Sequence, residues 1–208
     1  MTQRGVTVVK LGGSYACSTN LTLWLDAIAR GTGHVVIVPG GGPFADAVRA
    51  AQLRMRFDDV AAHRMALLAM EQFGHALVAL NPRLRVAASV AAIRRALRAN
   101  EVAVWSPAAM VLGAKDVPCS WDVTADSLAA WLAHRIGARR LLLVKQVEAP
   151  HHPVSARDLV ARGIVDSAFI AFLAASGVEA WIAGPDQHAE AALALACGHE
   201  IGCGIDLR

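Results

Sequence analysis

The sequence has no apolar run long enough to cross a lipid bilayer, which takes about 20 residues. Its first residues lead directly into a strand-like segment and lack the apolar stretch of a signal peptide. The four cysteines are scattered and form no CxxC pair, so the spacing indicates neither a disulfide framework nor a redox motif. From these absences we expect a cytoplasmic protein with no membrane partner.

Aromatic residues are also scarce, at 5% of the chain, and the net charge of +3 is only mildly basic. The arginine pairs Arg94-Arg95 and Arg139-Arg140 have no aromatic residues interleaved with them. Because a nucleic-acid surface usually combines basic clusters with stacking side chains, we expect no nucleic-acid partner. A site for phosphorylated ligands accounts for the positive charge equally well.

What the 208 residues do contain is an alternation of strand-like and helical segments with glycines at the turns. Continuous apolar segments such as 141–144 are typical of parallel strands covered on both faces. The alternation predicts one α/β domain with a parallel sheet and helices on both faces, whose ligands bind beyond the carboxyl ends of the strands. We expect strands at 6–11, 35–39, 85–87, 102–105, 140–145, 178–183 and within 200–207, and helices at 19–30, 44–55, 61–78, 91–99, 126–137, 155–176 with a break near Gly163, and 188–196.

A lysine and two glycines end the first expected strand, in the segment VVKLGGS. Two glycines let the backbone approach a ligand, and consecutive N–H groups there can bind an anion. Lys10 can bring its ammonium group to the same place, as phosphoryl transfer requires. An ordinary turn with a surface lysine is the alternative. We interpret Gly12, Gly13 and Ser14 as a loop that holds phosphates.

Three glycines stand between the second expected strand and the next helix, in VPGGGPFAD. They place bare backbone against a large or charged group, and the start of the helix adds its positive dipole end. A tight turn is the alternative, although it rarely needs three glycines between prolines. The segment matches neither a Walker A loop nor the GxGxxG fingerprint. We interpret Gly40, Gly41 and Gly42, with Asp46 behind them, as a second loop that meets a large or charged ligand.

The segment SWDVTADS carries two acidic residues at the start of a helix. Asp122 or Thr124 can cap the helix, but a cap does not need both Asp122 and Asp126. Asp126 can hold Lys10 in position or help to place Mg²⁺. Trp121 can wall a ring-shaped acceptor, with core packing as the alternative. We expect Trp121, Asp122 and Thr124 to contact an acceptor molecule.

Two further residues end strands at the same expected edge of the sheet. Lys145 follows the apolar segment 141–144 and can meet nucleotide phosphates, unless it is an ordinary solvated strand end. Gly184 closes the strand 178–183 and is assigned to the nucleotide side. The groups His151-His152 and Cys197, His199 and Cys203 only superficially resemble metal sites, because neither contains a complete ligand set.

Three segments in this order resemble the amino-acid kinase family, which includes acetylglutamate, aspartate and uridylate kinases. They are VVKLGGS, VVIVPGGGPFAD and DVTADSLAAWLAHRIGARRLLLVK. The resemblance runs through the whole chain and implies a three-layer αβα sandwich that uses ATP and Mg²⁺ and forms dimers or hexamers. Within one domain, residues 1 to about 115 would bind the acceptor and about 116–208 the nucleotide.

The resemblance also implies roles for single residues. Lys10 corresponds to the lysine that stabilises the transferring phosphoryl group, and Asp126 to the aspartate that organises the lysines. The first glycine loop would hold the ATP phosphates, and the second would lie between the γ-phosphate and the acceptor. Lys145 resembles the lysine of the TKVDGV motif of uridylate kinases, without its aspartate and glycine. The second lysine of acetylglutamate kinases has no counterpart at 163–169, which argues against an acylphosphate product.

The short length and the string WDVTADSLAAWLA resemble a smaller branch, the kinases of methanofuran biosynthesis. Their acceptor is 5-(aminomethyl)-3-furanmethanol phosphate, which becomes a diphosphate. Asp46 or Asp122 would then contact the amine. Another small phosphate or carboxylate, such as a nucleoside monophosphate, is an alternative acceptor. A non-catalytic nucleotide- or oxyanion-binding protein on the same fold is an alternative function.

Overall fold

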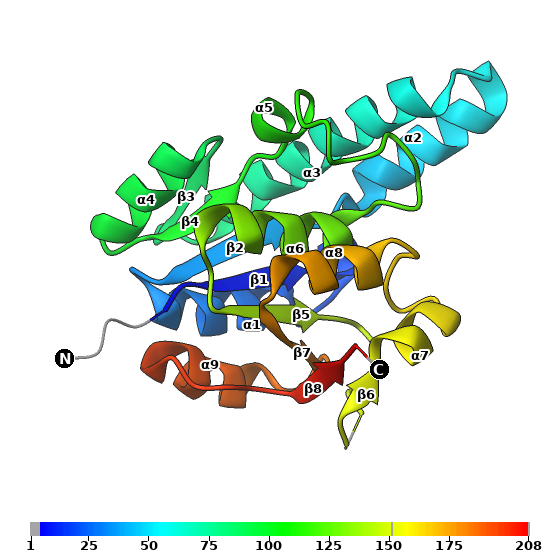
Figure 1. Cartoon of the computed structure of the whole chain (residues 1–208). Helices are drawn as coiled ribbons and strands as arrows, with labels where there is room; N and C mark the ends of the chain where they lie inside the picture. The colour runs from blue at the N-terminus through cyan, green and yellow to red at the C-terminus, as the bar shows by residue number, and fades with distance from the viewer. Residues whose placement is uncertain (1–4, 151, 208) are drawn as a thin grey trace.

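A mainly parallel sheet of eight strands forms the middle layer of the protein (Figure 1). The computed structural model describes residues 5–150 and 152–207. The strands lie in the order β3-β4-β2-β1-β5-β7-β8-β6, and β8 is antiparallel to β7. Their bounds are β1 Thr7–Leu11, β2 Val35–Pro39, β3 Leu84–Ala87, β4 Val102–Trp105, β5 Arg140–Val144, β6 Val154–Ser155, β7 Glu179–Ala183 and β8 Cys203–Asp206.

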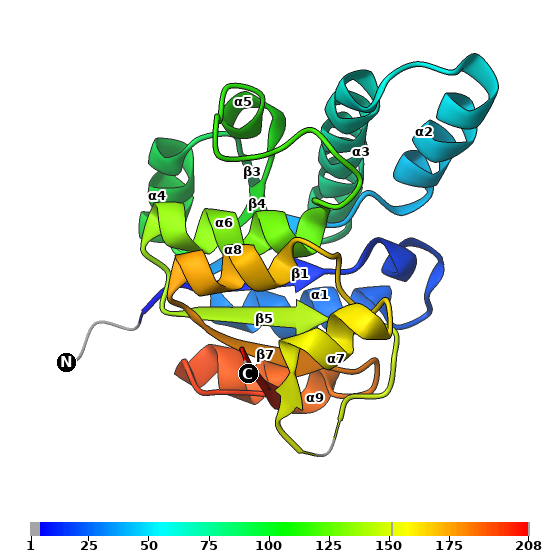
Figure 2. The same ribbon diagram turned by 45° about the vertical axis from the view of Figure 1, so that its right-hand side comes forward.

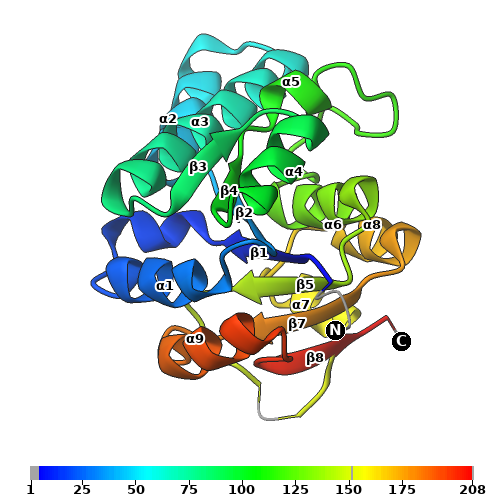
Figure 3. The same ribbon diagram turned by 90° about the vertical axis from the view of Figure 1, so that its left-hand side faces the viewer.

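Helices cover both faces of this sheet, as Figure 3 shows with α1 and α9 on one side and α6 and α8 on the other. The longer helices α2 and α3 pack side by side and extend away from the sheet (Figure 2). Their bounds are α1 Leu21–Ile28, α2 Gly42–Met55, α3 Asp59–Leu80, α4 Val90–Arg98, α5 Ala108–Val111, α6 Ala125–Ile136, α7 Ala156–Ala161, α8 Phe169–Ser176 and α9 His188–Cys197.

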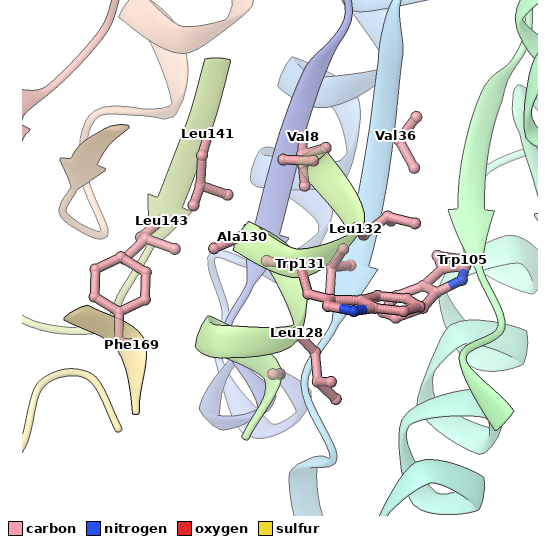
Figure 4. Close-up of a cluster of buried hydrophobic side chains, with 14 of the residues drawn as sticks. Val8, Val36, Trp105, Leu128, Ala130, Trp131, Leu132, Leu141, Leu143 and Phe169 are labelled. Atoms are coloured by element: carbon pink, nitrogen blue, oxygen red, sulfur yellow. The ribbon is translucent and has the colours of Figure 1, made fainter. Parts of the chain in front are cut away.

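The central strands are largely apolar because each of their faces meets a separate hydrophobic cluster. Val8 belongs to the cluster under α6, whereas its neighbour Val9 belongs to the cluster under α1 and α9. In the first cluster the rings of Trp105 and Trp131 stack with centroids 6.0 Å apart, and Phe169 of α8 packs beside Leu143 (Figure 4). Side chains alternate along a strand, so Lys10 shares the face of Val8 and is directed toward α6.

The predicted α/β sandwich with a mainly parallel sheet is confirmed. Two short elements, α5 and β6, were not expected. The break predicted near Gly163 is confirmed, because it separates α7 from α8. The third helix begins before its predicted start because Asp58 caps it, accepting a 2.8 Å hydrogen bond from the backbone N–H of Ala61. The helix predicted at 19–30 is the shorter α1, followed by a 3₁₀ turn.

Within the described part of the chain, no helix is both long and apolar enough to span a membrane. The division into an acceptor-binding and a nucleotide-binding half stays a prediction. The homo-oligomer also stays a prediction, and the α2–α3 pair carries large apolar side chains on its surface, among them Leu53 and Met55, which are 82% and 74% exposed.

Candidate functional site

Three adjacent strands bring the predicted phosphate-binding groups to one edge of the sheet. Lys10 lies in β1 in register with Val38 of β2 and Leu143 of β5. The first glycine loop follows β1, the second follows β2, and Lys145 comes directly after β5. Because all three strands are parallel, their carboxyl ends meet at the place where α/β proteins bind ligands.

The two glycine loops touch each other through their backbones. The N–H of Gly40 donates to the carbonyl of Leu11 over 2.9 Å. A Cβ atom at Gly13 would lie 2.3 Å from the nitrogen of Gly42, and one at Gly40 would lie 2.3 Å from the nitrogen of Gly13. No other residue fits at either position without displacing backbone. The glycines therefore permit the close approach of the two loops, and they leave the backbone bare of side chains.

Lys10 and Lys145 both contact the carboxylate of Asp126 in the first turn of α6. The Lys10 Nζ atom lies 3.0 Å from Oδ1, and the Lys145 Nζ atom lies 2.7 Å from Oδ2. The side chains of all three residues are at most 12% exposed. The Lys10 contact meets the distance of an ion pair but not the geometry of a hydrogen bond. Oδ1 therefore has a charged neighbour, and no described residue donates a hydrogen bond to it.

Burial and neighbouring charge act in opposite directions on this trio. Burial raises the pKa of Asp126, but the ammonium groups of Lys10 and Lys145 outweigh it, so the pKa is lowered overall. Burial, and next the charge of Lys10, lower the pKa of Lys145 to about 8, although Asp126 opposes the shift. At neutral pH the trio therefore holds two positive charges and one negative charge, which leaves a net positive site for phosphate oxygens.

The start of α6 is capped by a residue that the sequence did not indicate. Thr124 stands at the N-cap position, but its side chain makes no capping bond. Instead, Oδ2 of Asp166 accepts from the backbone N–H groups of Thr124 and Ser127 over 3.0 and 3.1 Å and from the Thr124 hydroxyl over 2.7 Å. The predicted cap by Asp122 or Thr124 is wrong, because a carboxylate from between α7 and α8 occupies that place.

The Asp122 carboxylate forms hydrogen bonds away from the start of α6. Its carboxylate accepts from the hydroxyls of Ser167 and Ser120, each over 2.9 Å, and these two bonds lower its pKa. It is exposed and does not line the cavity beside the glycine loops, unlike its neighbour Trp121. Of the two carboxylates expected near an acceptor amine, Asp46 alone reaches the cavity wall.

The cavity has a volume of about 500 Å³ and lies between the glycine loops, α2, α3 and the start of α6. Lys10, Asp46, Trp121 and Thr124 line it, together with five of the six predicted loop residues on its floor and an apolar wall. The floor consists of Gly13, Ser14, Gly40, Gly41 and Gly42, and the wall contains Ala66, Leu67, Met70, Val123 and Leu128. Gly12, Lys145 and Gly184 lie outside this lining.

A second group of polar side chains forms the rim of this cavity. The Arg49 guanidinium carbon lies 4.3 Å from the centre of the Trp121 ring and a nitrogen of the same group lies 3.2 Å from Asp46. The Trp121 indole N–H donates to Gln52 over 2.7 Å, which fixes the ring against α2. Trp121 is half-buried and belongs to neither hydrophobic cluster. Sequence reasoning missed Arg49, because an arginine on an amphipathic helix gives no local signal.

His63 of α3 is a further cavity residue that the sequence did not single out. It is buried, and burial lowers its pKa, while a hydrogen bond with the Ser120 backbone opposes the shift. The imidazole therefore stays neutral at physiological pH and can exchange hydrogen bonds with a bound molecule.

The remaining predicted residues lie around the carboxyl ends of β5 and β7. The Tyr15 hydroxyl, in the turn after the first glycine loop, donates to the Lys145 carbonyl over 3.0 Å. The N–H of Gly184 donates to the Gln187 side chain over 2.9 Å, and the Trp24 indole donates to Pro185 over 2.9 Å. The bonds of Tyr15 and Trp24 join the first loop and α1 to the ends of β5 and β7, which are assigned to the nucleotide.

The described residues contain no group of three or more His, Cys, Asp or Glu side chains that could hold a metal ion. His151 lies outside the described residues, and the thiol of the buried Cys203 contacts the His152 carbonyl. Both oxygens of Asp126 face ammonium groups, so this carboxylate suits the organisation of lysines better than a metal. The bare loops and the net positive trio do fit phosphates, and Mg²⁺ would accompany the phosphates of ATP.

Comparison with known proteins identifies relatives over most of the chain. Residues 5–149 match the amino acid kinase family. The [5-(aminomethyl)furan-3-yl]methyl phosphate kinase of Methanocaldococcus jannaschii is 23% identical over 143 residues, which are 68% of this chain and 66% of that protein.

Solved structures of uridylate kinases share the fold. The enzyme from Archaeoglobus fulgidus has a TM-score of 0.68 at 18% identity, over 97% of this chain and 100% of the other. The UMP kinase from Bacillus anthracis has a TM-score of 0.72 at 16% identity, over 97% and 96% of the two chains. At these identities the likeness concerns the fold alone.

Proposed function

The chain belongs to the amino acid kinase family and is a kinase, and from this premise we propose that it transfers the γ-phosphoryl group of ATP to the phosphate group of a small acceptor. The observation that carries the proposal is the buried pairing of Lys10 and Lys145 with Asp126 beside two loops of bare backbone. Phosphoryl transfer depends mainly on alignment and on neutralising charge, and this arrangement supplies both.

In the proposed reaction an oxygen of the acceptor phosphate forms a bond to the γ-phosphorus of ATP, and the bond to the β,γ-bridging oxygen breaks, releasing ADP. Lys10 reaches the cavity and stabilises the charge on the transferring group. Lys145 neutralises charge from the nucleotide side, and Asp126 keeps the two ammonium groups apart and in place. A phosphate acceptor is already anionic, so the reaction needs no general base.

For the acceptor we propose 5-(aminomethyl)-3-furanmethanol phosphate, which would become its diphosphate in the synthesis of a methanofuran-type cofactor. The M. jannaschii relative bears the name of this activity. The cavity supports the proposal because Arg49 can meet the phosphate and Asp46 can meet a cationic amine. The apolar wall, which includes Leu67 and Met70, suits a furan ring.

A nucleoside monophosphate is the second candidate acceptor, since uridylate kinases share the fold. Its ribose and base edges need several hydrogen-bond partners, which the polar part of the lining, including Asp46, His63 and Thr124, would have to supply. A non-catalytic binding protein on the same fold is a further alternative, because the second family lysine is missing from 163–169. Lys145 argues against it, since it places a second buried lysine on Asp126 from a different element.

The test is ATP turnover with a panel of acceptors: the furan phosphate, UMP, acetylglutamate and buffer alone. We expect turnover with the furan phosphate, Mg²⁺ dependence, and loss of activity in Lys10→Ala. Turnover with UMP and with no other member of the panel would reject the furan phosphate and identify UMP as the acceptor. ATP binding without turnover on any acceptor, or a Lys10→Ala variant with full activity, would reject the catalytic role.

We also propose that the protein is a homo-oligomer. The exposed Leu53 and Met55 at the end of α2 are the kind of apolar surface that self-association buries. Light scattering on the protein and on Leu53→Glu tests this: an oligomer that the substitution dissociates is expected, and a wild-type monomer at micromolar concentration would reject it.

A further inference from the structure

Five residues between α7 and α8, which we call the 164–168 segment, contact three separate parts of the site. The Ile164 carbonyl accepts from the Lys145 ammonium group over 2.5 Å. Asp166 accepts from the start of α6. The Ser167 hydroxyl and the Ala168 N–H donate to the carboxylate and carbonyl of Asp122, the neighbour of Trp121 on the cavity rim. One short segment is therefore bonded to a lysine, to the helix of Asp126 and to the residue beside the rim tryptophan.

Asp166 makes the largest number of these bonds. Its Oδ2 atom accepts two backbone N–H groups and the Thr124 hydroxyl, and its Oδ1 atom accepts from the Ser127 hydroxyl. These donors lie 39 and 42 residues away in sequence, on either side of Asp126. Charge-assisted bonds of this kind are shorter and stronger than neutral ones, so Asp166 fixes the first turn of α6 in direction as well as in place.

The position of Asp126 follows from that first turn. Its carboxylate must meet Lys10 of β1 and Lys145 after β5, which belong to two adjacent strands. A rotation of the helix start would lengthen one contact or both. Because the 164–168 segment also bonds to Lys145, it sets the relative position of both members of the shorter ion pair.

We propose that Asp166 is a positioning residue of the transfer site, which holds the Asp126 carboxylate where it meets Lys10 and Lys145. The catalytic consequence of this role rests on the proposed kinase function, whereas the positional consequence does not. Asp166 does not line the cavity and touches neither lysine in the contacts described, so it acts through α6.

The first experiment needs no acceptor. The chain has three lysines, Lys10, Lys115 and Lys145, and trace labelling with acetic anhydride across pH, read by mass spectrometry, reports the titration of each. Lys115 is exposed and is the internal reference. In the wild type, Lys145 should react with a midpoint set by burial, Lys10 and Asp126. In Asp166→Ala that midpoint should fall, because the Asp126 carboxylate, which raises the pKa of Lys145, is no longer held against the ammonium group.

The matched control is Ser89→Ala, which removes the side-chain cap of the distant helix α4. It should lower thermal stability as Asp166→Ala does, while the Lys145 midpoint stays at its wild-type value. Should Asp166→Ala fail to fold, Asp166→Asn replaces it, since the amide retains one accepting oxygen. Equal loss of stability in both variants with an unchanged Lys145 midpoint would reduce Asp166 to an ordinary helix cap and overturn the proposal.

The second experiment measures kcat with ATP and the furan phosphate. A misplacement of about 1 Å in a transfer site can cost on the order of 100-fold, so Asp166→Asn should lower kcat by about 10- to 100-fold with little change in ATP binding. In an Asp126→Asn background the same change should cause no further loss. Losses that multiply would show that Asp166 acts independently of Asp126. If the wild type phosphorylates no acceptor, the proposed function fails, and the labelling result still decides the position of Asp126.

Discussion

The ammonium nitrogen of Lys145 lies 2.7 Å from Oδ2 of Asp126, and both side chains are nearly withdrawn from water. A buried ion pair is held at a desolvation cost, and it contributes little net stability compared with apolar packing. Here the same carboxylate also meets Lys10. The arrangement is therefore better explained by the placement of positive charge at the ends of β1 and β5 than by stability.

Removing the charge of Asp126 should damage both activity and stability. Asp126→Asn leaves two buried ammonium groups without a counter-charge, so the free energy of unfolding should fall by about 3–5 kcal/mol, and kcat should fall by about 100-fold or more. Steady-state kinetics and urea unfolding measure the two effects. Asp116→Asn, which loses an exposed carboxylate bonded to Trp131 and Arg135, is the control and should retain kcat. Equal effects in both variants would contradict the assignment.

The contact between the glycine loops predicts the effect of a single methyl group. Gly40→Ala would place a Cβ atom 2.3 Å from the nitrogen of Gly13, so the loops must separate and the binding of ATP and acceptor should both weaken. Gly113→Ala adds the same methyl group at a position where no other described residue lies within 4 Å, so it should have no effect on either ligand. Calorimetric titration with ATP measures the difference, and unchanged affinity in Gly40→Ala would refute a shared loop.

The pH dependence follows from Lys145, whose pKa of about 8 lies below the usual value of 10.5 because of burial and the charge of Lys10. Above about pH 8 the neutral amine no longer offsets phosphate charge, so kcat should decline. Between about pH 8 and pH 10.5, Lys145 is mostly neutral in the folded protein but still protonated in the unfolded chain. Because the unfolded chain binds more protons in this range, the contribution of Lys145 to the free energy of unfolding should rise with pH. Urea unfolding of wild type and Lys145→Met at several pH values isolates that contribution. A kcat that stays constant through pH 9.5 would count against a charged Lys145 in the reaction.

Arg49 is expected to bind the acceptor and not the nucleotide. It lines the cavity and stacks on Trp121, where a planar guanidinium can meet a phosphate with two donors. Arg49→Gln should raise the KM for the acceptor by about 10-fold or more, the value of one charge-assisted bond, and leave the KM for ATP unchanged. Arg54→Gln, an exposed arginine on the same helix, serves as the comparison. If the KM for ATP rises and the KM for the acceptor does not, Arg49 binds the nucleotide.

The sequence predicted the parts of the site that depend on neighbours along the chain. Lys10 and Lys145 interrupt or end apolar strands, and Asp126 begins a helix, so their meeting at one sheet edge could be inferred from parallel topology. The two glycine loops follow adjacent parallel strands, so their position at the same edge could be inferred in the same way. These inferences succeed because strand direction and side-chain alternation are local properties that fix where a strand's last residues lie.

Asp166 and Arg49 could not be found in this way. Asp166 caps a helix that begins about 40 residues earlier in the chain, and a capping pattern is recognised only between near neighbours. Arg49 belongs to the site because Trp121, which comes from another part of the chain, packs against its guanidinium group. The sequence does not reveal that contact. The antiparallel β8 was likewise hidden, because the direction of an edge strand depends on its connection and not on its composition.

The register of β1 restricts where insertions and deletions can occur during the evolution of this protein. Lys10 points toward α6 only because it lies two residues after Val8 on the same face of a strand paired on both sides. Insertion or deletion of one codon before Lys10 within β1 would turn the ammonium group toward α1 and carry an apolar residue to Asp126. Related sequences should therefore vary in length at their loops, while the spacing from the start of β1 to its lysine stays constant.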